Sequence, residues 1–198
     1  MSGWGGAGIR TRATAMCALA LTQVSAAIAG GDPLTVVEKT ISARFVVDEV
    51  LTRELAAALS SADSSSYLVF DVREPDEYER SHVRRARRLA PDTKLTAFEA
   101  EFGDSLAGKR LVFYCSVGYR SSILAERVLD SAKKSGAVSV ANLRGGIFRW
   151  YNDGRTVYDA ADTTDQIHPY DRVWGAFVNQ RLLAPAPPTP APADGSEK

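Results

Sequence analysis

The residues whose types and spacing can do chemistry in this chain lie within positions 111–122, in the stretch LVFYCSVGYRSS. An apolar run with the character of a strand leads directly into Cys115, and a helix is expected to begin near Ser121. In open α/β sheets, sites form at the carboxyl ends of strands. Backbone N–H groups and a helix N-terminus there create an anion pocket. A thiol in such a pocket has a lowered pKa and ionises more readily to the nucleophilic thiolate.

Two residues of the loop after Cys115 support this interpretation. Gly118 allows a backbone angle closed to other residues, so the loop can curl around a bound anion. Arg120 adds a planar cation at the rim, and Ser121 is interpreted as the cap of the following helix. The candidate substrate-binding residues of this loop are Ser116, Val117, Gly118, Tyr119 and Arg120.

Each of these residues also has an ordinary structural explanation. A lone cysteine is commonly a small buried hydrophobe, a glycine forms turns, and an arginine is commonly exposed. The strand end, Gly118, Arg120 and the helix start occur in register, and this combination favours a nucleophilic Cys115. The other cysteine, Cys17, lies in an N-terminal segment that we expect to be removed, so one cysteine would remain, and it could form no internal disulfide.

Apolar runs and the helices between them must position the loop. Residues 67–72, 110–114 and 138–143 read as strands buried on both faces. Their alternation with helices predicts an α/β domain with a central, mostly parallel sheet and helices on both faces. The expected helices cover 53–62 with Thr52 as cap, a short segment from Pro75, 95–102, 121–136 and an aromatic segment within 144–153.

Composition indicates one ordinary globular domain with appendages. The chain has 198 residues, 45% hydrophobic and 24% charged, with a formal net charge of zero. The basic excess of nucleic-acid-binding proteins is missing, and the run RRARR at 84–88 is interpreted as exposed surface. We therefore expect no nucleic-acid partner.

The N-terminal segment differs from the rest of the chain. Residues 1–29 combine two arginines, no acid, an apolar run and a small-x-small end. This pattern predicts a secretory signal peptide and export, with the periplasm as the expected compartment. The apolar run is too interrupted for a membrane span, so we expect no stable membrane insertion after cleavage. A cytoplasmic or organellar location is the alternative if residues 1–29 are not a secretory signal.

The remainder divides by composition into four parts. We expect a lead-in at 30–50, a domain at 51–154, an arm at 155–183 that packs on the domain, and a disordered Pro/Ala-rich tail at 184–198. Without residues 1–29 the chain carries 22 basic and 24 acidic residues and a net charge of −2.

Three segments together resemble one known family. The segment CSVGYRS after an apolar strand is similar to the active-site loop of rhodanese-type sulfurtransferases. The upstream LVFDVREPDEYERSHV and the downstream NLRGGIFRW resemble two further motifs of the same domain. Each segment alone is weakly specific, but their shared order and spacing over roughly residues 51–153 is strongly specific. The resemblance implies a single rhodanese-like domain.

The resemblance also implies a reaction. Cys115 would attack the outer sulfur of a donor such as thiosulfate and become a persulfide, and a thiol, cyanide or protein acceptor would take that sulfur. The loop amides would stabilise the anionic sulfur, and Arg120 would hold an anionic donor or product. Neither a metal nor an organic cofactor is required.

Residues upstream of the loop are assigned supporting roles. Asp71 and Arg73 match the family's Asp-x-Arg, and we expect a buried pair that braces the active loop and the turn before Pro75. His82 matches the family's histidine and is interpreted as structural. After it, this chain lacks the proline and glycine usual in the family, which changes the geometry of that turn.

Three other functions stay open. Phosphatases and arsenate reductases of related fold also use a cysteine loop, but with five residues between cysteine and arginine, whereas four separate Cys115 from Arg120. No carboxylate is assigned as their leaving-group acid. A non-catalytic binding module and a persulfide carrier for one dedicated partner are the remaining alternatives.

Overall fold

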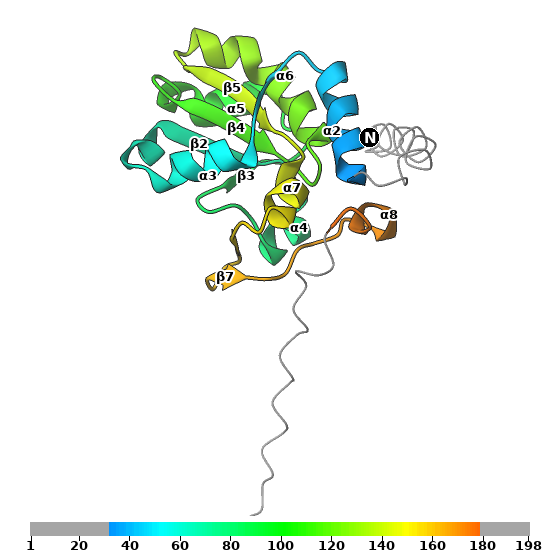
Figure 1. The fold of residues 1–198 in the computed structure, drawn as a ribbon. Helices are drawn as coiled ribbons and strands as arrows, with labels where there is room; N and C mark the ends of the chain where they lie inside the picture. Colours follow the sequence, from blue (N-terminus) through cyan, green and yellow to red (C-terminus); the bar gives the residue numbers. More distant parts are fainter. Residues whose placement is uncertain (1–31, 179–198) are drawn as a thin grey trace, which may run out of the picture.

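A five-stranded sheet forms the centre of the molecule in the computed structural model, which describes residues 32–178 (Figure 1). The strands run in the order β1-β5-β4-β2-β3, and every neighbouring pair is parallel. They are β1 (Asp48–Val50), β2 (Tyr67–Asp71), β3 (Arg87–Arg88), β4 (Arg110–Tyr114) and β5 (Ser139–Leu143). The predicted α/β fold is confirmed. The expected signal peptide at 1–29 and the tail at 184–198 lie outside the described residues.

Helices cover both faces of the sheet. α2, α3 and α7 contribute to one hydrophobic cluster, and α5 and α6 contribute to the other. Along β4, Val112 and Tyr114 belong to the first cluster while Leu111 and Phe113 belong to the second, so the strand is buried on both faces. The helices are α2 (Pro33–Arg44), α3 (Thr52–Ser60), α4 (Pro75–Arg80), α5 (Leu95–Phe102), α6 (Tyr119–Lys134) and α7 (Gly146–Asn152), with short 3-10 turns at Ala62–Ser66 and Gly103–Ser105.

Two predicted helix starts are wrong by one or two residues. The helix after the cysteine loop begins at Tyr119, and its N-cap is Gly118, with φ of 105°. Ser121 therefore lies inside the first turn and is not the cap. In α3 the N-cap is Leu51, while the hydroxyl of Thr52 donates to the carboxylate of Asp153.

Helix α2 was not expected from the sequence. Asp32 caps it by accepting from the amide of Leu34, and Pro33 occupies the first turn, where its fixed φ is favourable. Leu34, Val37 and Ile41 of this helix are buried in the core. A largely buried ion pair also joins it to α7, because Arg149 Nε lies 2.6 Å from Glu38 Oε1.

The chain after α7 forms a small hairpin and a short helix. β6 (Val157–Tyr158) and β7 (Thr163–Thr164) pair antiparallel, and α8 (Arg172–Gly175) follows. Figure 1 shows the arm on the same side of the molecule as α4 and α7. Among residues 32–178, none of the helices combines the length and apolar character needed to span a bilayer.

A buried ion pair fixes the turn between β2 and α4. Arg73 Nε and Nη2 donate to the two carboxylate oxygens of Asp71, at 2.8 and 2.6 Å. Both side chains are fully buried. Arg73 Nη2 also donates to the carbonyl of Ser81. The expected pair is therefore present. Because Arg73 contacts Asp71 before α4 and Ser81 after it, the pair fixes both ends of the helix that carries Glu77.

The N-terminus of α7 fixes the cysteine loop from the other side. The amide of Ile147 donates to the carbonyl of Cys115 at 2.9 Å, and the amide of Phe148 donates to that of Ser116 at 3.0 Å. Gly146, with φ of 58°, lies against these carbonyls. A Cβ there would stand 2.6 Å from Ser116 O and closer still to Cys115 O. The double glycine of the sequence therefore permits close contact between the helix and the loop.

Replacing Asp71 by Ala leaves the buried Arg73 charge without its carboxylate. We expect the free energy of unfolding to fall by about 3–5 kcal/mol. Because Asp71→Ala/Arg73→Met removes both charges, its loss should be smaller than the sum of the two single losses. Urea unfolding of Asp71→Ala, Arg73→Met and the double variant measures this coupling. If the two single losses add up to the loss of the double variant, the two side chains do not stabilise each other.

Replacing Gly146 by Ala combines a strained φ with a backbone clash. We expect a loss of about 2–5 kcal/mol and a displaced cysteine loop. Gly154→Ala is the matched control, because Gly154 has φ of 71° but open space around it. That control should lose only about 1–2 kcal/mol. Equal losses in urea unfolding would show that the contact with the loop carries no energy.

Candidate active site

Cys115 lies at the carboxyl end of the central strand β4 with 1% of its surface exposed. Its loop continues through Gly118 into α6. Because α7 binds the carbonyls of Cys115 and Ser116, the loop can turn its amides inward, and the amide of Gly118 points to Cys115 Sγ at 3.2 Å. The structure thus places the thiol at the base of a loop whose backbone donors face the sulfur.

The surroundings of Cys115 favour the thiolate. Burial by itself would raise the pKa of the thiol. The positive charge of Arg120, hydrogen bonds from Ser121 and the amide of Gly118 together outweigh burial and bring the pKa below its usual value. An ionised sulfur is the form that acts as a nucleophile.

Ser121 and Asn142 support the sulfur from within the helix and the sheet. The hydroxyl of Ser121 donates to Asn142 Oδ1 at 2.7 Å, and the same hydroxyl faces Cys115. Its single proton serves either the amide oxygen or the sulfur. A Cβ on Gly118 would stand 2.9 Å from Asn142 Nδ2, so this position requires glycine both for its φ and for space. Asn142 was not expected at the site from the sequence, although a buried polar residue near the carboxyl end of a strand indicates a site residue.

A buried carboxylate to which the sequence assigned no role lies beside the loop. Glu77 of α4 is 1% exposed and binds Arg120 through both oxygens, at 2.7 and 2.8 Å. Its Oε1 also accepts from the hydroxyl of Ser116 at 2.8 Å, and that hydroxyl accepts from Arg120 Nη2 at 3.0 Å. Burial would raise the pKa of Glu77, but Arg120 and Arg73 lower it overall. Glu77 is therefore an ionised partner of Arg120 and a poor proton donor.

This ion pair changes the position of Arg120 relative to the expectation. The guanidinium does lie near the sulfur, as its effect on the pKa of Cys115 requires. Its two terminal nitrogens, however, donate to Glu77 and Ser116, and only 12% of its side chain is exposed. The ring of Tyr170 lies over the guanidinium, with its centroid 4.9 Å from Cζ. Arg120 therefore braces the loop as well as facing the sulfur.

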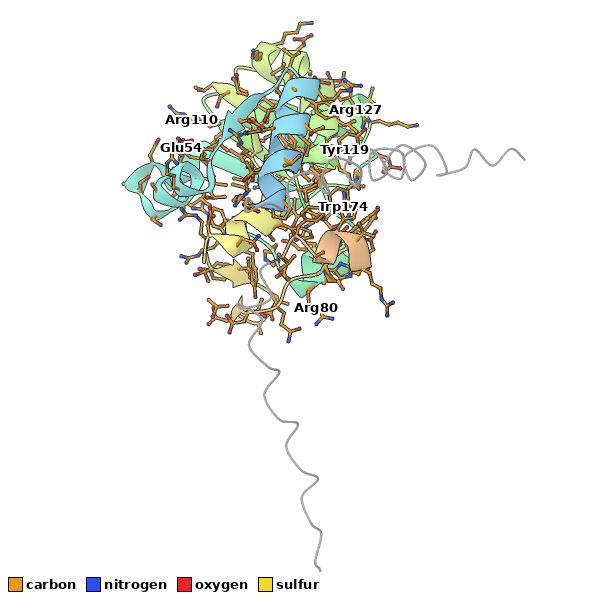
Figure 2. All side chains as sticks on the ribbon, turned by 45° about the vertical axis from the view of Figure 1, so that its right-hand side comes forward. Glu54, Arg80, Arg110, Tyr119, Arg127 and Trp174 are labelled. Carbon is orange, nitrogen blue, oxygen red and sulfur yellow. The ribbon has the colours of Figure 1, made fainter. Side chains whose placement is uncertain are left out.

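A small cavity opens at Cys115. It has a volume of about 40 Å³. Figure 2 labels Tyr119, the first residue of α6, and Trp174, a residue of α8, on the same side of the molecule. Phe45, which follows α2, packs edge-on against Tyr119 at 5.4 Å between ring centroids. The lining residues are Cys115, Ser116, Val117, Tyr119, Arg120, Tyr170 and Trp174. Four of the five predicted loop residues thus line the cavity. The fifth, Gly118, contacts the sulfur through its amide.

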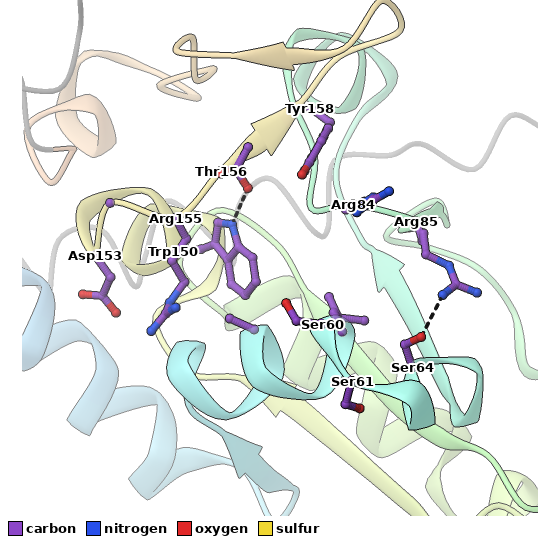
Figure 3. Close-up of a pocket in the computed structure, with 13 residues that line it drawn as sticks. Ser60, Ser61, Ser64, Arg84, Arg85, Trp150, Asp153, Arg155, Thr156 and Tyr158 are labelled. Carbon is purple, nitrogen blue, oxygen red and sulfur yellow. Dashed lines mark hydrogen bonds between the residues drawn. The ribbon is translucent and has the colours of Figure 1, made fainter.

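A larger hollow of about 700 Å³ lies elsewhere, between α3 and the segment after α7 (Figure 3). Arg84 and Arg85 line it, together with Arg155 and the buried Trp150. Arg84 and Arg85 are exposed, as predicted. No residue of the cysteine loop lines this hollow, so these cations do not surround Cys115.

His82 lies outside the cysteine loop and contacts α4. Its ring stacks on Tyr78 with centroids 4.2 Å apart, and its Nδ1 lies 3.1 Å from the carbonyl of Tyr78. Its backbone pairs with Tyr158. These contacts agree with a structural histidine. Within residues 32–178, no group of three or more His, Cys, Asp or Glu side chains is arranged to hold a metal ion.

Two known proteins are similar to part of this chain. The uncharacterized protein YqhL of Bacillus subtilis is 25% identical over 108 residues, which cover 54% of this chain and 79% of that protein. The tRNA uridine(34) hydroxylase of Oceanobacillus iheyensis is 33% identical over 118 residues, which cover 58% of this chain but 34% of the enzyme. The chain therefore spans about a third of that relative.

Solved structures show the same fold. The thiosulfate sulfurtransferase of Pseudomonas aeruginosa superposes with a TM-score of 0.51 at 20% identity, over 74% of this chain and 27% of that one. The model of the Rhodanese-like domain matches residues 52–153, which include Asp71, Cys115 and Gly146. The protein therefore belongs to the family of rhodanese-like domains.

Proposed function

We propose that this protein is a sulfurtransferase that carries sulfane sulfur as a persulfide on Cys115. In the first step the Cys115 thiolate attacks the outer sulfur of a donor such as thiosulfate. A new S–S bond forms between Cys115 Sγ and this sulfur, which gives the persulfide Cys–S–S⁻. The S–S bond of the donor breaks, and sulfite leaves with the bonding electron pair. In the second step an acceptor anion such as cyanide attacks the outer persulfide sulfur, leaves as thiocyanate and restores the thiolate.

The observation that carries this proposal is the environment of Cys115 Sγ. The sulfur lies 3.2 Å from the amide of Gly118 and near Arg120, and its pKa is lowered although it is buried. The same donors can stabilise the terminal sulfur of a persulfide, which is also an anion. A core cysteine kept for packing would need none of these donors.

The dimensions of the site support sulfur transfer over phosphoryl chemistry. Four residues separate Cys115 from Arg120, and most of this loop lines a small cavity of about 40 Å³. A loop of this length fits the terminal sulfur of a persulfide better than a tetrahedral phosphate group. The nearby Glu77 is ionised and paired with Arg120, so it does not supply the proton that a departing alcohol would need.

Cys115→Ser should abolish sulfur transfer. We expect the full-length chain with Cys17→Ser, which keeps Cys115 as its one thiol, to gain the mass of one sulfur atom after treatment with a sulfane-sulfur donor. Cys115→Ser should gain none, because it lacks the nucleophile. Intact-mass spectrometry and thiocyanate formation measure the two steps. A wild-type chain that gains no sulfur from any donor, or that instead hydrolyses phosphate esters, would refute the proposal.

The charges of Glu77 and Arg120 should shift the thiol pKa in opposite directions. Glu77→Gln leaves the Arg120 cation uncompensated, so the thiolate should persist to a lower pH than in wild type. Glu77→Gln/Arg120→Gln removes the cation that lowers the thiol pKa, while burial continues to raise it. The pKa of Cys115 should therefore rise above the wild-type value. Ultraviolet absorbance of the thiolate against pH, in the Cys17→Ser background, gives the three values. A wild-type pKa at or above the free value of about 8.5 would contradict the assignment.

A further inference from the structure

The arm after the family domain crosses the entrance to Cys115. Its first half is held by the buried Ile167 and by Tyr151, whose hydroxyl donates to the carbonyl of Asp165 at 2.7 Å. Its last part is held by the buried Val178 and by Asn152, which donates to the carbonyl of Phe177 at 2.8 Å. Both ends are thus fixed to the α7 side of the domain, and the residues between them span the cavity.

Two aromatic side chains of this arm face the cavity. Tyr170 and Trp174 both line it. Tyr170 holds a positive φ of 66°, which is uncommon for a residue with a side chain, and its amide donates to His168 Nδ1 at 3.0 Å. Asp171 caps α8 by accepting from the amides of Val173 and Trp174. These local bonds set the direction of both rings.

The entrance is apolar and carries little free charge. Val117, Tyr119, Tyr170 and Trp174 make up most of its lining. Arg120 is the cation of this lining, and it already has the Glu77 carboxylate as a partner and the Tyr170 ring over its face. A doubly charged inorganic donor would lose its hydration here without gaining an unpaired cation, which is costly. An apolar group would gain contact with aromatic faces.

The small cavity limits which part of a donor can enter. The cavity has a volume of about 40 Å³, and the transferred sulfur is the part of the donor that must reach Cys115. The remainder of the donor must stay at the entrance, where Tyr170 and Trp174 lie. The chemistry of these two side chains therefore acts on the group that carries the sulfur.

We propose that Tyr170 and Trp174 form a binding subsite for the organic group of a singly charged sulfane-sulfur donor, and so select organic donors over thiosulfate. This inference rests on the proposed sulfurtransferase function. With a thiosulfonate, R–SO₂–S⁻, the Cys115 thiolate attacks the terminal sulfur. The new S–S bond forms on Cys115, the S–S bond of the donor breaks, and the sulfinate R–SO₂⁻ leaves with the electron pair.

Three donors that share the transferable sulfur test the subsite. Thiosulfate is a dianion, whereas methanethiosulfonate and benzenethiosulfonate are monoanions that differ only in the aromatic ring. For the full-length Cys17→Ser chain we expect kcat/KM to be lowest for thiosulfate, and to be about three- to tenfold higher for benzenethiosulfonate than for methanethiosulfonate, the contribution of one aromatic pair. Thiocyanate formation with cyanide as acceptor is the readout.

Trp174→Ala should lower the ratio of kcat/KM for benzenethiosulfonate to kcat/KM for methanethiosulfonate to about one. Trp174→Phe should retain the preference, because it keeps a ring. Val173→Ala is the matched control, since Val173 lies on the same turn, is 39% exposed and does not line the cavity. It should behave as the parent chain does.

Other outcomes would overturn the inference in recognisable ways. If Trp174→Ala lowers kcat/KM for both thiosulfonates equally, the arm only supports the fold. If it raises kcat/KM for all donors, the arm obstructs the site and selects nothing. If wild type uses thiosulfate best, the subsite is absent while the sulfurtransferase function stands. Failure of every donor to place sulfur on Cys115 would instead refute the proposed function.

Discussion

The geometry of the site depends on two hydrogen bonds between the N-terminus of α7 and the cysteine loop. The amides of Ile147 and Phe148 bind the carbonyls of Cys115 and Ser116. A peptide unit points its N–H away from its C=O, so holding these carbonyls outward leaves the following amides free to face the sulfur. Gly146 permits the contact because any side chain there would collide with the loop. The sulfur environment is thus set by packing between two elements that are distant in sequence.

The Glu77–Arg120 pair adds a second constraint on the same loop. Arg120 must lie near the sulfur to lower its pKa, yet an uncompensated buried cation would be costly. Glu77 compensates that charge, and α4 holds Glu77 in place through the buried Asp71–Arg73 pair at its base. The thiolate, the two arginines and the two carboxylates therefore form one connected arrangement of charges. It lowers the thiol pKa while leaving the entrance with little charge of its own.

The sequence predicted those features whose causes are local. β4 and α5 were predicted at their observed bounds, because a continuous apolar run and a compact helical segment define them. The start of α6 was misplaced because serine is the commoner N-cap, whereas this loop uses Gly118 to turn an amide toward the sulfur. The start of helix α2 could have been predicted from Asp32 as N-cap and Pro33 as the first helical residue. Glu77 stands in the segment LVFDVREPDEYERSHV that resembles the family, but its role arises from tertiary contacts with Arg120 and Ser116. Trp174 had no local signal, because its role arises only from its position at the cavity.

The order of these elements along the chain has a consequence for synthesis. Cys115 leaves the ribosome well before Gly146, Ile147 and Phe148, which hold its loop in shape. Until those residues have folded against the sheet, no hydrogen bonds from α7 hold the loop carbonyls, so the loop amides are not fixed toward the sulfur. The nascent chain therefore carries an ordinary thiol, and reactivity is acquired only when the domain is nearly complete. The pKa of Cys115 is therefore lowered only when the fold around it is complete.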